Sequence, residues 1–173
     1  MRPLAEPAVR DLPSEAGDFE AFFRSEYPRL VRAVYLLSGA RAEAEDVAQE
    51  AMARVYERWE RVRAMDAPDG YLYRVALHLE RRRRYRLGVQ ARKLRPTGRE
   101  PADPAVVAEA RSDVLRALVA LPRADREVLV LAGWLGLDGS QAAAVLRVKP
   151  STARARLSRA RARFRTELGE GYA

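Results

Sequence analysis

Apolar residues recur at three- and four-residue spacings along nearly the whole chain, and this is the period of amphipathic helices. In the first such stretch Phe19 and Phe22 fall near one face, with Asp18 expected as the N-cap and Gly39 as the stop. Pro28 lies inside this stretch and is expected to kink or split the helix. No segment alternates with a period of two, so the sequence predicts an all-α fold.

The helical segments form two groups separated by a stretch without periodicity. Helices are expected over residues 18–38, 42–62, 68–86, 105–120, 124–135, 140–146 and 151–168. Gly, Pro and charged residues gather between the two groups, which indicates a basic linker. The expected organisation is a flexible leader over 1–17, a first module over 18–87, a linker over 88–105 and a second module over 106–169.

Charge is distributed unevenly along the 173 residues, whose net charge is +8. The net charge is −4 over residues 1–60, +8 over 61–100, −1 over 101–137 and +5 over 138–173. Charge that serves only solubility is expected to be spread evenly along a chain. Two separate contacts with polyanions, in contrast, require two basic blocks. The charge pattern therefore favours a protein that binds nucleic acid.

The stretch "GSQAAAVLRVKPSTARARLSRARARF" has the layout of a helix-turn-helix, with a short helix, a tight turn over 147–150 and a long helix for which Ser151 is the expected N-cap. One apolar stripe of the long helix consists of Ala153, Leu157, Ala160, Phe164 and Leu168. The opposite face carries Ser151, Ala155, Ser158, Arg159 and Ala162, flanked by Arg154 and Arg156. Small outward residues let a helix approach base edges while arginines reach bases or phosphates. The alternative is a solvated helix face, which fits Arg161, Arg163 and Arg165 better.

Acidic residues cluster on the second expected helix, where Glu43, Asp46 and Glu50 lie close to one face with Gln49 beside them. Such a cluster has three alternative interpretations: a metal site, a docking face for a basic partner, or charge that is simply solvated. The metal interpretation lacks partners, because His78 is the only histidine and there is no cysteine. We expect no catalytic residue, cofactor or metal from this sequence.

The third expected helix combines Tyr71, Tyr73, Arg74 and His78 with the run "RRRRYR". Aromatic rings interleaved with arginines suit single-stranded DNA, because bases stack on rings and the backbone follows positive charge. The alternative is that the tyrosines belong to the core and the arginines to a solvated helix end.

Three motifs, "AEDVAQEAMARVYERW", "GYLYRVALHLERRRRYR" and "SQAAAVLRVKPSTARARLSRARARF", resemble in their order and spacing the extracytoplasmic-function (ECF) sigma factors of bacterial RNA polymerase. The resemblance is to the SigE-like branch and covers roughly residues 18–87 and 106–168. It implies a sigma region 2 domain of three helices followed by a sigma region 4 helix-turn-helix domain.

The resemblance implies a role for each cluster. Docking on the β′ coiled coil of core RNA polymerase is implied for Glu43, Asp46, Gln49 and Glu50. Capture and melting of −10 promoter DNA is implied for Arg61, Arg63, Asp69, Tyr71, Tyr73, Arg74 and His78. Reading of −35 DNA is implied for Ser151, Thr152, Arg154, Ala155, Arg156, Ser158 and Arg159. The polymerase β flap and an anti-sigma factor are further partners that the resemblance allows.

The chain departs from the family pattern at several positions. Leu77-His78 stands where the family often has Arg-Asn, Arg82 where it has an acid, and Tyr71 where it has tryptophan. Arg147 replaces the usual turn glycine, so we expect an unfavourable backbone conformation or a different turn there.

Two other functions are compatible with parts of the sequence: a stand-alone helix-turn-helix regulator that binds duplex DNA as a dimer, and a metal-dependent nuclease built on the acidic cluster. The regulator does not explain the acidic helix or the two basic blocks. The absence of cysteine fits a reducing cytosol, and no apolar run reaches the roughly 20 residues of a membrane span. The N-terminus has no apolar segment typical of a signal peptide.

Overall fold

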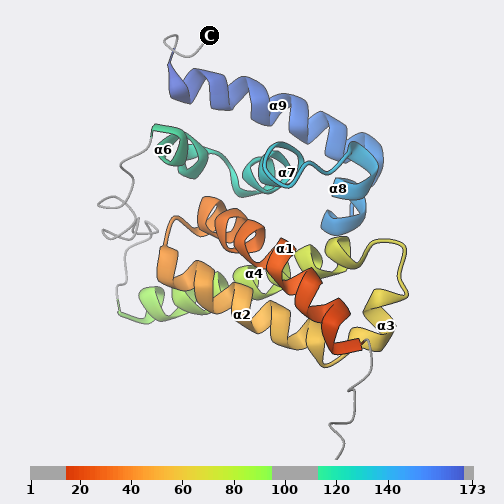
Figure 1. Ribbon diagram of the computed structural model, residues 1–173. Helices are drawn as coiled ribbons and strands as arrows, with labels where there is room; N and C mark the ends of the chain where they lie inside the picture. The colour runs from red at the N-terminus through yellow and green to blue at the C-terminus, as the bar shows by residue number, and fades with distance from the viewer. Residues whose placement is uncertain (1–14, 95–112, 170–173) are drawn as a thin grey trace, which may run out of the picture.

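The computed structural model describes residues 15–94 and 113–169, and within these ranges every regular element is a helix. The helices are α1 (Glu15–Ser38), α2 (Arg41–Tyr56), α3 (Trp59–Arg63), α4 (Pro68–Leu94), α6 (Asp113–Ala120), α7 (Arg123–Gly133), α8 (Gly139–Leu146) and α9 (Pro150–Leu168). Figure 1 shows them as two groups, with α6–α9 lying over α1–α4. The prediction of an all-α fold with two helical modules is confirmed.

The first module is built around α2, whose buried face consists largely of alanine. Ala44, Ala48 and Ala51 are completely buried and lie one above the other along this helix. Their small side chains let α2 approach both α1 and α4, the two helices that it contacts most. Larger residues such as Leu30 and Leu72 fill the space on either side.

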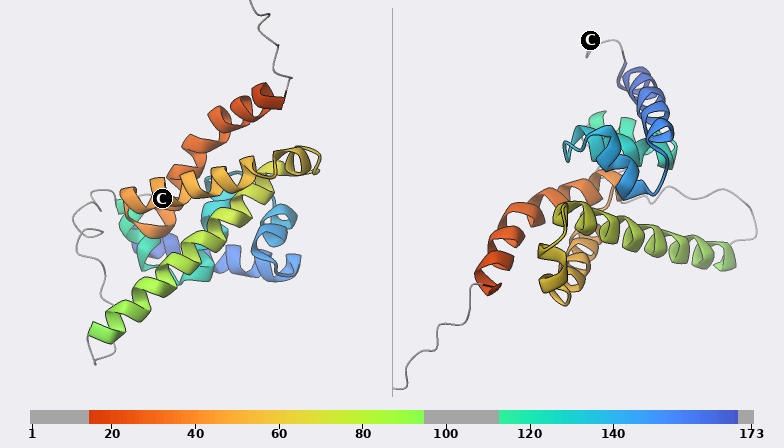
Figure 2. Two further views of the ribbon diagram at one scale, coloured as in Figure 1. Left: turned by 90° about the horizontal axis from the view of Figure 1, so that it is seen from below. Right: turned by 90° about the vertical axis from the view of Figure 1, so that its right-hand side faces the viewer.

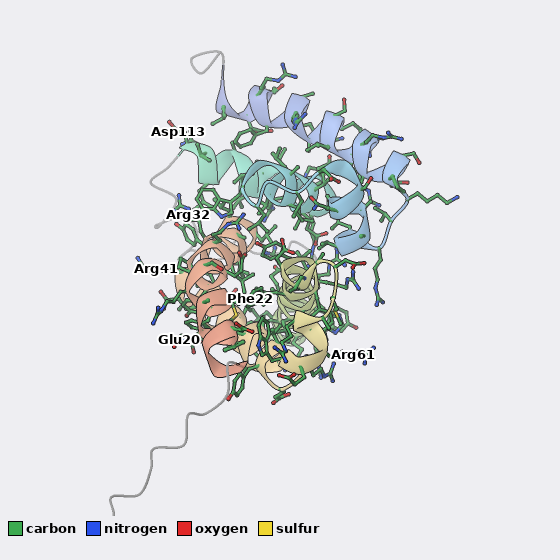
Figure 3. The ribbon with its side chains drawn as sticks, turned by 45° about the vertical axis from the view of Figure 1, so that its right-hand side comes forward. Glu20, Phe22, Arg32, Arg41, Arg61 and Asp113 are labelled. Atoms are coloured by element: carbon green, nitrogen blue, oxygen red, sulfur yellow. The ribbon has the colours of Figure 1, made fainter. Side chains whose placement is uncertain are left out.

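An aromatic cluster holds the start of α1 against the end of α2 and α3. The Phe19 ring lies 4.8 Å from the Tyr56 ring and 5.3 Å from the Trp59 ring, measured between centroids. Phe22 lies 5.0 Å from Trp59 and points inward from α1 in Figure 3. Ring pairs at these separations add stability beyond the area that they bury, so the cluster fixes the position of short α3.

The second module packs α9 across α7 and α8. The stripe predicted for α9 is confirmed: Ala153 and Ala160 are buried, and Leu157, Phe164 and Leu168 are partly buried. Figures 1 and 2 both show α9 on the side of this module farthest from α1–α4. The outward face of α9 therefore points away from the first module.

The first predicted helix starts earlier than expected and ends where expected. Helix α1 begins at Glu15, so Asp18 lies inside it and is not an N-cap, and the helix continues through Pro28 without splitting. The predicted stop at Gly39 is confirmed by its φ of 77°, which glycine adopts without strain.

The other two corrections concern helix ends. The predicted second helix divides after Tyr56, because the aromatic cluster holds Trp59 in a separate turn. Helix α4 continues to Leu94, so the first residues of the expected linker are helical. The leader up to residue 14, and residues 95–112 with the start of the expected helix 105–120, lie outside the described residues.

Arginine and glutamate side chains join the two modules where α4 meets α7. Arg81 of α4 donates to Glu127 of α7 (Nε to Oε1, 3.0 Å), and Arg123 of α7 donates to Glu80 of α4 (Nη2 to Oε2, 2.6 Å). Both carboxylates are almost fully buried. A buried carboxylate without a partner would strongly destabilise the fold, so these ion pairs constrain how the modules can meet.

The C-terminal end of α1 forms the second part of the same joint. The Leu37 carbonyl, in the last turn of α1, accepts from Arg126 of α7 (2.7 Å) and from Arg84 of α4 (3.0 Å). The carbonyls in the last turn of a helix have no partner within the helix, so these donors satisfy an acceptor that would otherwise be unpaired. Burial lowers the pKa of Arg126 to about 10, and its guanidinium is still a cation at neutral pH.

A third contact joins α1 to the residues that follow α7. The Trp134 indole donates to the Arg29 carbonyl (3.1 Å), and the Arg29 guanidinium donates to the Leu135 carbonyl (2.9 Å). The Arg32 guanidinium lies 5.7 Å from the Trp134 ring centroid, and Figure 3 shows Arg32 where α1 approaches the second module. The two modules are thus in direct contact along α1 and α4.

We predict that Glu127→Gln makes stability less dependent on pH in the acid range. Burial alone would raise the pKa of Glu127, but hydrogen bonds from Arg81 and Arg123 outweigh it and hold the pKa below 4.5. A depressed carboxyl pKa contributes stability that is present above the unfolded-state pKa and is lost as the pH falls through the folded-state pKa. Urea unfolding should therefore show a loss of about 1–3 kcal/mol in the variant at pH 7, and a smaller loss below about pH 4.

Glu45→Gln is the matched control, because Glu45 forms only a partly exposed pair with Arg41. Its unfolding free energy should change by less than about 1 kcal/mol. An equal effect of both substitutions would contradict a special role for Glu127.

Candidate nucleic-acid interface

A capping box begins the helix-turn-helix. The Asp138 side chain accepts from the backbone N–H groups of Ser140 (2.7 Å) and Gln141 (2.8 Å), and the Gln141 side chain accepts from the Asp138 N–H (2.9 Å). This reciprocal arrangement satisfies donors that the first turn of α8 would leave unpaired. It fixes where α8 starts and therefore how the turn after it is positioned.

The turn between α8 and α9 depends on Arg147. Its φ of 56° and ψ of 46° place it in the left-handed region, where it is the only non-glycine residue among those described. The predicted unfavourable conformation is therefore confirmed. The predicted cap at Ser151 is wrong: Pro150 occupies the first turn of α9, and Lys149 is the N-cap without a side-chain hydrogen bond.

The outward face of α9 combines small side chains with arginines. Ser151, Arg154, Ala155, Ser158 and Arg159 are exposed, whereas Thr152 and Arg156 are partly buried at its edges. Within the described chain, the side chains of α9 that donate hydrogen bonds are those of Arg163, Arg165 and Thr166, so the donors of Arg154, Ser158 and Arg159 on this face are not engaged. This face can approach a DNA groove closely and still has donors available for bases and phosphates.

Arg163, predicted to be a solvated residue, is exposed as expected and also has a structural contact. It donates to the buried carboxylate of Asp125 on α7 (2.8 Å) and so helps to hold α9 on its module. Arg161 and Arg165, like Arg163, are exposed as predicted. The arginines of α9 therefore divide between a free face and an internal contact.

The acidic cluster on α2 is a surface feature. Asp46, Gln49 and Glu50 are exposed and Glu43 is partly buried. Asp46 pairs with Arg83 (3.0 Å) and Glu50 with Arg54 (2.6 Å), and both pairs are well exposed to solvent. Exposed pairs contribute little stability, so a basic partner can displace the arginines at small cost.

Among residues 15–94 and 113–169, no three His, Asp or Glu side chains converge in a way that could hold a metal ion. In the same ranges no helix is long and apolar enough to cross a membrane.

The residues predicted for −10 DNA are divided between two places. Tyr71, Arg74 and His78 of α4 line a cleft of about 610 Å³, whose opposite wall includes Val145 and Leu146 of α8 and Arg147 of the turn that follows. The Nε of Arg74 is buried and has no hydrogen-bond partner. Basic side chains dominate this cleft, so it suits an anion.

Arg61 and Arg63 lie on α3, away from this cleft, and Figure 3 shows Arg61 at the end of the first module that is remote from the second. Arg63 pairs with Glu60 (2.8 Å), and Asp69 is partly buried in the first turn of α4. None of these three residues lines the cleft that Tyr71 lines.

Tyr73 is placed in the core and not at a DNA-facing surface. Its side chain is only 1% exposed, and its hydroxyl donates to the carboxylate of Glu26 on α1. Burial and this hydrogen bond raise the pKa of Tyr73 above its ordinary range. Its ring is not available for stacking on a base in this conformation, so the core alternative applies to Tyr73.

Sequence reasoning did not identify Arg58 and Arg147 as members of this surface. Arg58 donates to the Tyr71 hydroxyl (3.3 Å), and Arg147 reaches the cleft from the second module. A pattern within one helix cannot show either contact, because the first joins residues 13 positions apart and the second joins two modules.

Comparisons with known proteins agree with this architecture. The family model described as Sigma-70 region 2 matches residues 22–87, and the one described as Sigma-70, region 4 matches residues 111–164. The RNA polymerase sigma-E factor of Streptomyces coelicolor is 33% identical over 160 residues, which cover 89% of this chain and 88% of that protein. The ECF RNA polymerase sigma factor SigM of Mycobacterium tuberculosis is 30% identical over 164 residues, covering 89% and 80%.

The fold is shared with a solved complex of the sigma factor RpoE and the anti-sigma factor NepR from Bartonella quintana. The TM-score is 0.76 at 21% identity, over 89% of this chain and 98% of the sigma factor. CnrH, solved with the cytosolic domain of CnrY, gives a TM-score of 0.65 at 23% identity, over 87% of each chain.

This chain therefore belongs to the sigma-70 family of RNA polymerase sigma factors. Within that family it falls in the ECF group, whose members direct promoter-specific initiation of transcription together with RNA polymerase.

We predict that Arg147→Gly stabilises the protein by about 1 kcal/mol, because glycine adopts the left-handed conformation without the clash of a Cβ atom. Urea unfolding at neutral pH would measure the gain. Arg147→Ala removes the same charge but keeps the Cβ atom, and it should leave stability nearly unchanged. If both variants were stabilised equally, the cause would be lost charge repulsion and not the backbone.

Proposed function

We propose that this protein docks on core RNA polymerase through the acidic face of α2 and reads the promoter with two separate surfaces. The residues proposed for docking are Glu43, Asp46, Gln49 and Glu50. Helix α9 reads the −35 element through Ser151, Thr152, Arg154, Ala155, Arg156, Ser158 and Arg159. The first module binds −10 DNA through Arg61, Arg63, Asp69, Tyr71, Arg74 and His78.

The observation that carries this proposal is the separation of opposite charges onto different exposed faces. The free donors lie on α9, and the exposed carboxylates lie on α2 in the other module. DNA and a basic protein partner can therefore be bound together without competing for one surface. Family membership identifies the protein partner as core polymerase.

The chain performs no catalysis of its own in this proposal and acts where the polymerase is, in the cytoplasm. An anti-sigma protein belongs to the proposed partners, since both solved neighbours are described as complexes with a second protein, which one of them calls an anti-sigma factor. A dimeric regulator remains the less favoured function, because it leaves the acidic face of α2 without a purpose.

Reconstitution tests the proposal. The purified chain is mixed with core polymerase and a library of promoter fragments, and transcripts are sequenced. Promoter-dependent transcripts support the proposal, and failure to bind core polymerase contradicts it. Tight duplex binding by the free protein at half-sites about one helical turn apart would favour the dimeric regulator.

We predict that Asp46→Ala weakens binding to core polymerase roughly tenfold, because a charge that faces the basic partner is lost. A fluorescence titration with core polymerase measures this. Glu45→Ala is the control, since it removes the same charge from the same helix outside the proposed docking face. Equal weakening by both variants would show that only the total charge of α2 matters.

We predict that Arg159→Ala weakens use of the −35 element by about 1–3 kcal/mol, the usual contribution of one arginine contact to a base, and leaves polymerase binding intact. Transcription from promoters with and without an intact −35 element measures this effect. Arg165→Ala, in the last turn of α9, should have little effect. If Arg159→Ala and Asp46→Ala impaired the same step equally, the proposed division of roles would be wrong.

A further inference from the structure

The cleft of about 610 Å³ beside α4 gathers basic side chains from several parts of the fold. Its basic lining residues are Arg54, Arg58, Arg74, His78, Arg81 and Arg147. Among the described residues that line it, Glu57 is the acidic one. Like charges around one space repel one another, and shielding a cation from water costs free energy unless an anion offsets it. The cleft therefore has the charge of an anion-binding site.

Two of these arginines are already paired with carboxylates of the protein. Arg54 pairs with Glu50 (2.6 Å), and Arg81 pairs with the buried carboxylate of Glu127. Because these two charges are offset, the excess positive charge of the cleft comes from the other arginines.

In the described part of the chain, the other three arginines have no carboxylate partner: these are Arg58, Arg74 and Arg147. Arg58 donates to the Tyr71 hydroxyl (3.3 Å), which is a neutral group. The Nε of Arg74 is buried and has no hydrogen-bond partner. Buried donors in native proteins nearly always have a partner, so this nitrogen needs an acceptor that the protein does not supply.

The backbone of Arg147 gives a second, independent indication of a ligand. Arg147 lines the cleft from the turn between α8 and α9, in a left-handed conformation (φ 56°, ψ 46°). Glycine adopts this conformation without strain, so an arginine here costs stability that a glycine would not. Backbone strain is concentrated at functional sites, where the position of a side chain matters more than its cost. A guanidinium that binds an anion in the cleft explains why an arginine occupies this turn.

The remaining lining residues suit a flat, partly apolar group. The Tyr71 side chain is partly exposed, and Val75, Val145 and Leu146 also line the cleft. Nucleic-acid bases stack on aromatic rings, and the guanidinium fork of arginine binds phosphate through two parallel hydrogen bonds. The volume of about 610 Å³ lies within the range of about 300–1,000 Å³ that is usual for small-ligand pockets. Together these features fit a ligand with both a base and phosphates.

We propose that this cleft is a binding site for a free nucleotide, a nucleoside di- or triphosphate. Arg58, Arg74 and Arg147 bind the phosphates, and Tyr71 stacks on the base. Three cations match the several negative charges of such a ligand. Tyr71 and Arg74 are also proposed for −10 DNA, so promoter DNA is a second source of the same phosphate and base chemistry. The nucleotide site does not depend on that proposed function, because it needs neither polymerase nor promoter.

Calorimetric titration of the full chain with GTP, and separately with ATP, tests the site without polymerase or DNA. We expect at least one of the two nucleotides to bind at one molecule per chain with a Kd below about 100 µM at physiological salt. The matching nucleoside, which has no phosphate, and pyrophosphate, which has no base, should each bind at least about tenfold more weakly. The site is overturned if neither nucleotide binds, or if pyrophosphate binds as tightly as both.

Arg147→Gly is the sharpest variant, because it should stabilise the fold and weaken nucleotide binding at the same time. Loss of the guanidinium should raise the Kd about tenfold, and opposite signs of the two effects exclude unfolding as the cause. Arg74→Ala should weaken binding to a similar extent. Arg82→Ala is the matched control, because Arg82 is exposed on the same helix as Arg74 and lies outside the cleft. Equal weakening by Arg82→Ala and Arg147→Gly would show that only total charge matters, and would contradict the site.

Titration with a mixed-sequence single-stranded DNA oligonucleotide separates the two sources of this chemistry. Arg147 is not among the residues proposed for −10 DNA, so Arg147→Gly should weaken nucleotide binding and leave oligonucleotide binding nearly unchanged. If the variant lost affinity for both by the same factor, the cleft would be a path for a DNA strand and the nucleotide site would be wrong. Failure to support transcription with core polymerase, while nucleotide binding is intact, contradicts the proposed function and not the site.

Discussion

The two buried carboxylates of Glu80 and Glu127 constrain the whole arrangement. Each is removed from water at the boundary between the modules, and a carboxylate in that position must be met by cations with good geometry. Arginines from both modules meet this requirement only when α4 lies against α7. This contact brings α8 over the α4 cleft, so it determines how far Tyr71 and Arg74 are exposed, and it leaves α9 on the far side.

The arginine run on α4 shows how one stretch of like charge divides into several tasks. Successive residues of a helix differ by about 100° in direction, so neighbours reach different surroundings. Arg81 pairs across the joint, Arg83 pairs with Asp46 of the acidic face, and Arg84 holds Glu80 and the end of α1. Arg82 is left exposed. Three of the five arginines in the run 81–86 are therefore engaged in internal contacts.

The helix-turn-helix contrasts with this, because its local features are set by residues close in sequence. Asp138 and Gln141 cap α8, Arg147 makes the turn and Pro150 starts α9. These contacts span at most a few residues, so the module can present the outward face of α9 without help from α1–α4. The left-handed backbone of Arg147 lowers the stability of this module. Glycine would relieve that strain, but it has no side chain to reach the cleft.

The sequence by itself determined the helices, the apolar stripe of α9, the turn at Arg147 and the family, since these depend on spacing and on neighbouring residues. The tertiary structure decided which side chains are engaged in contacts: Tyr73 is buried against Glu26, and Arg163 is paired with Asp125. It also shows that Asp18 lies inside α1 and not at its start. It also decided how the modules meet, through pairs such as Arg81 and Glu127 that are 46 residues apart. Periodicity shows which side of a helix must be covered, but it does not show which helix covers it, because that depends on distant residues meeting in space.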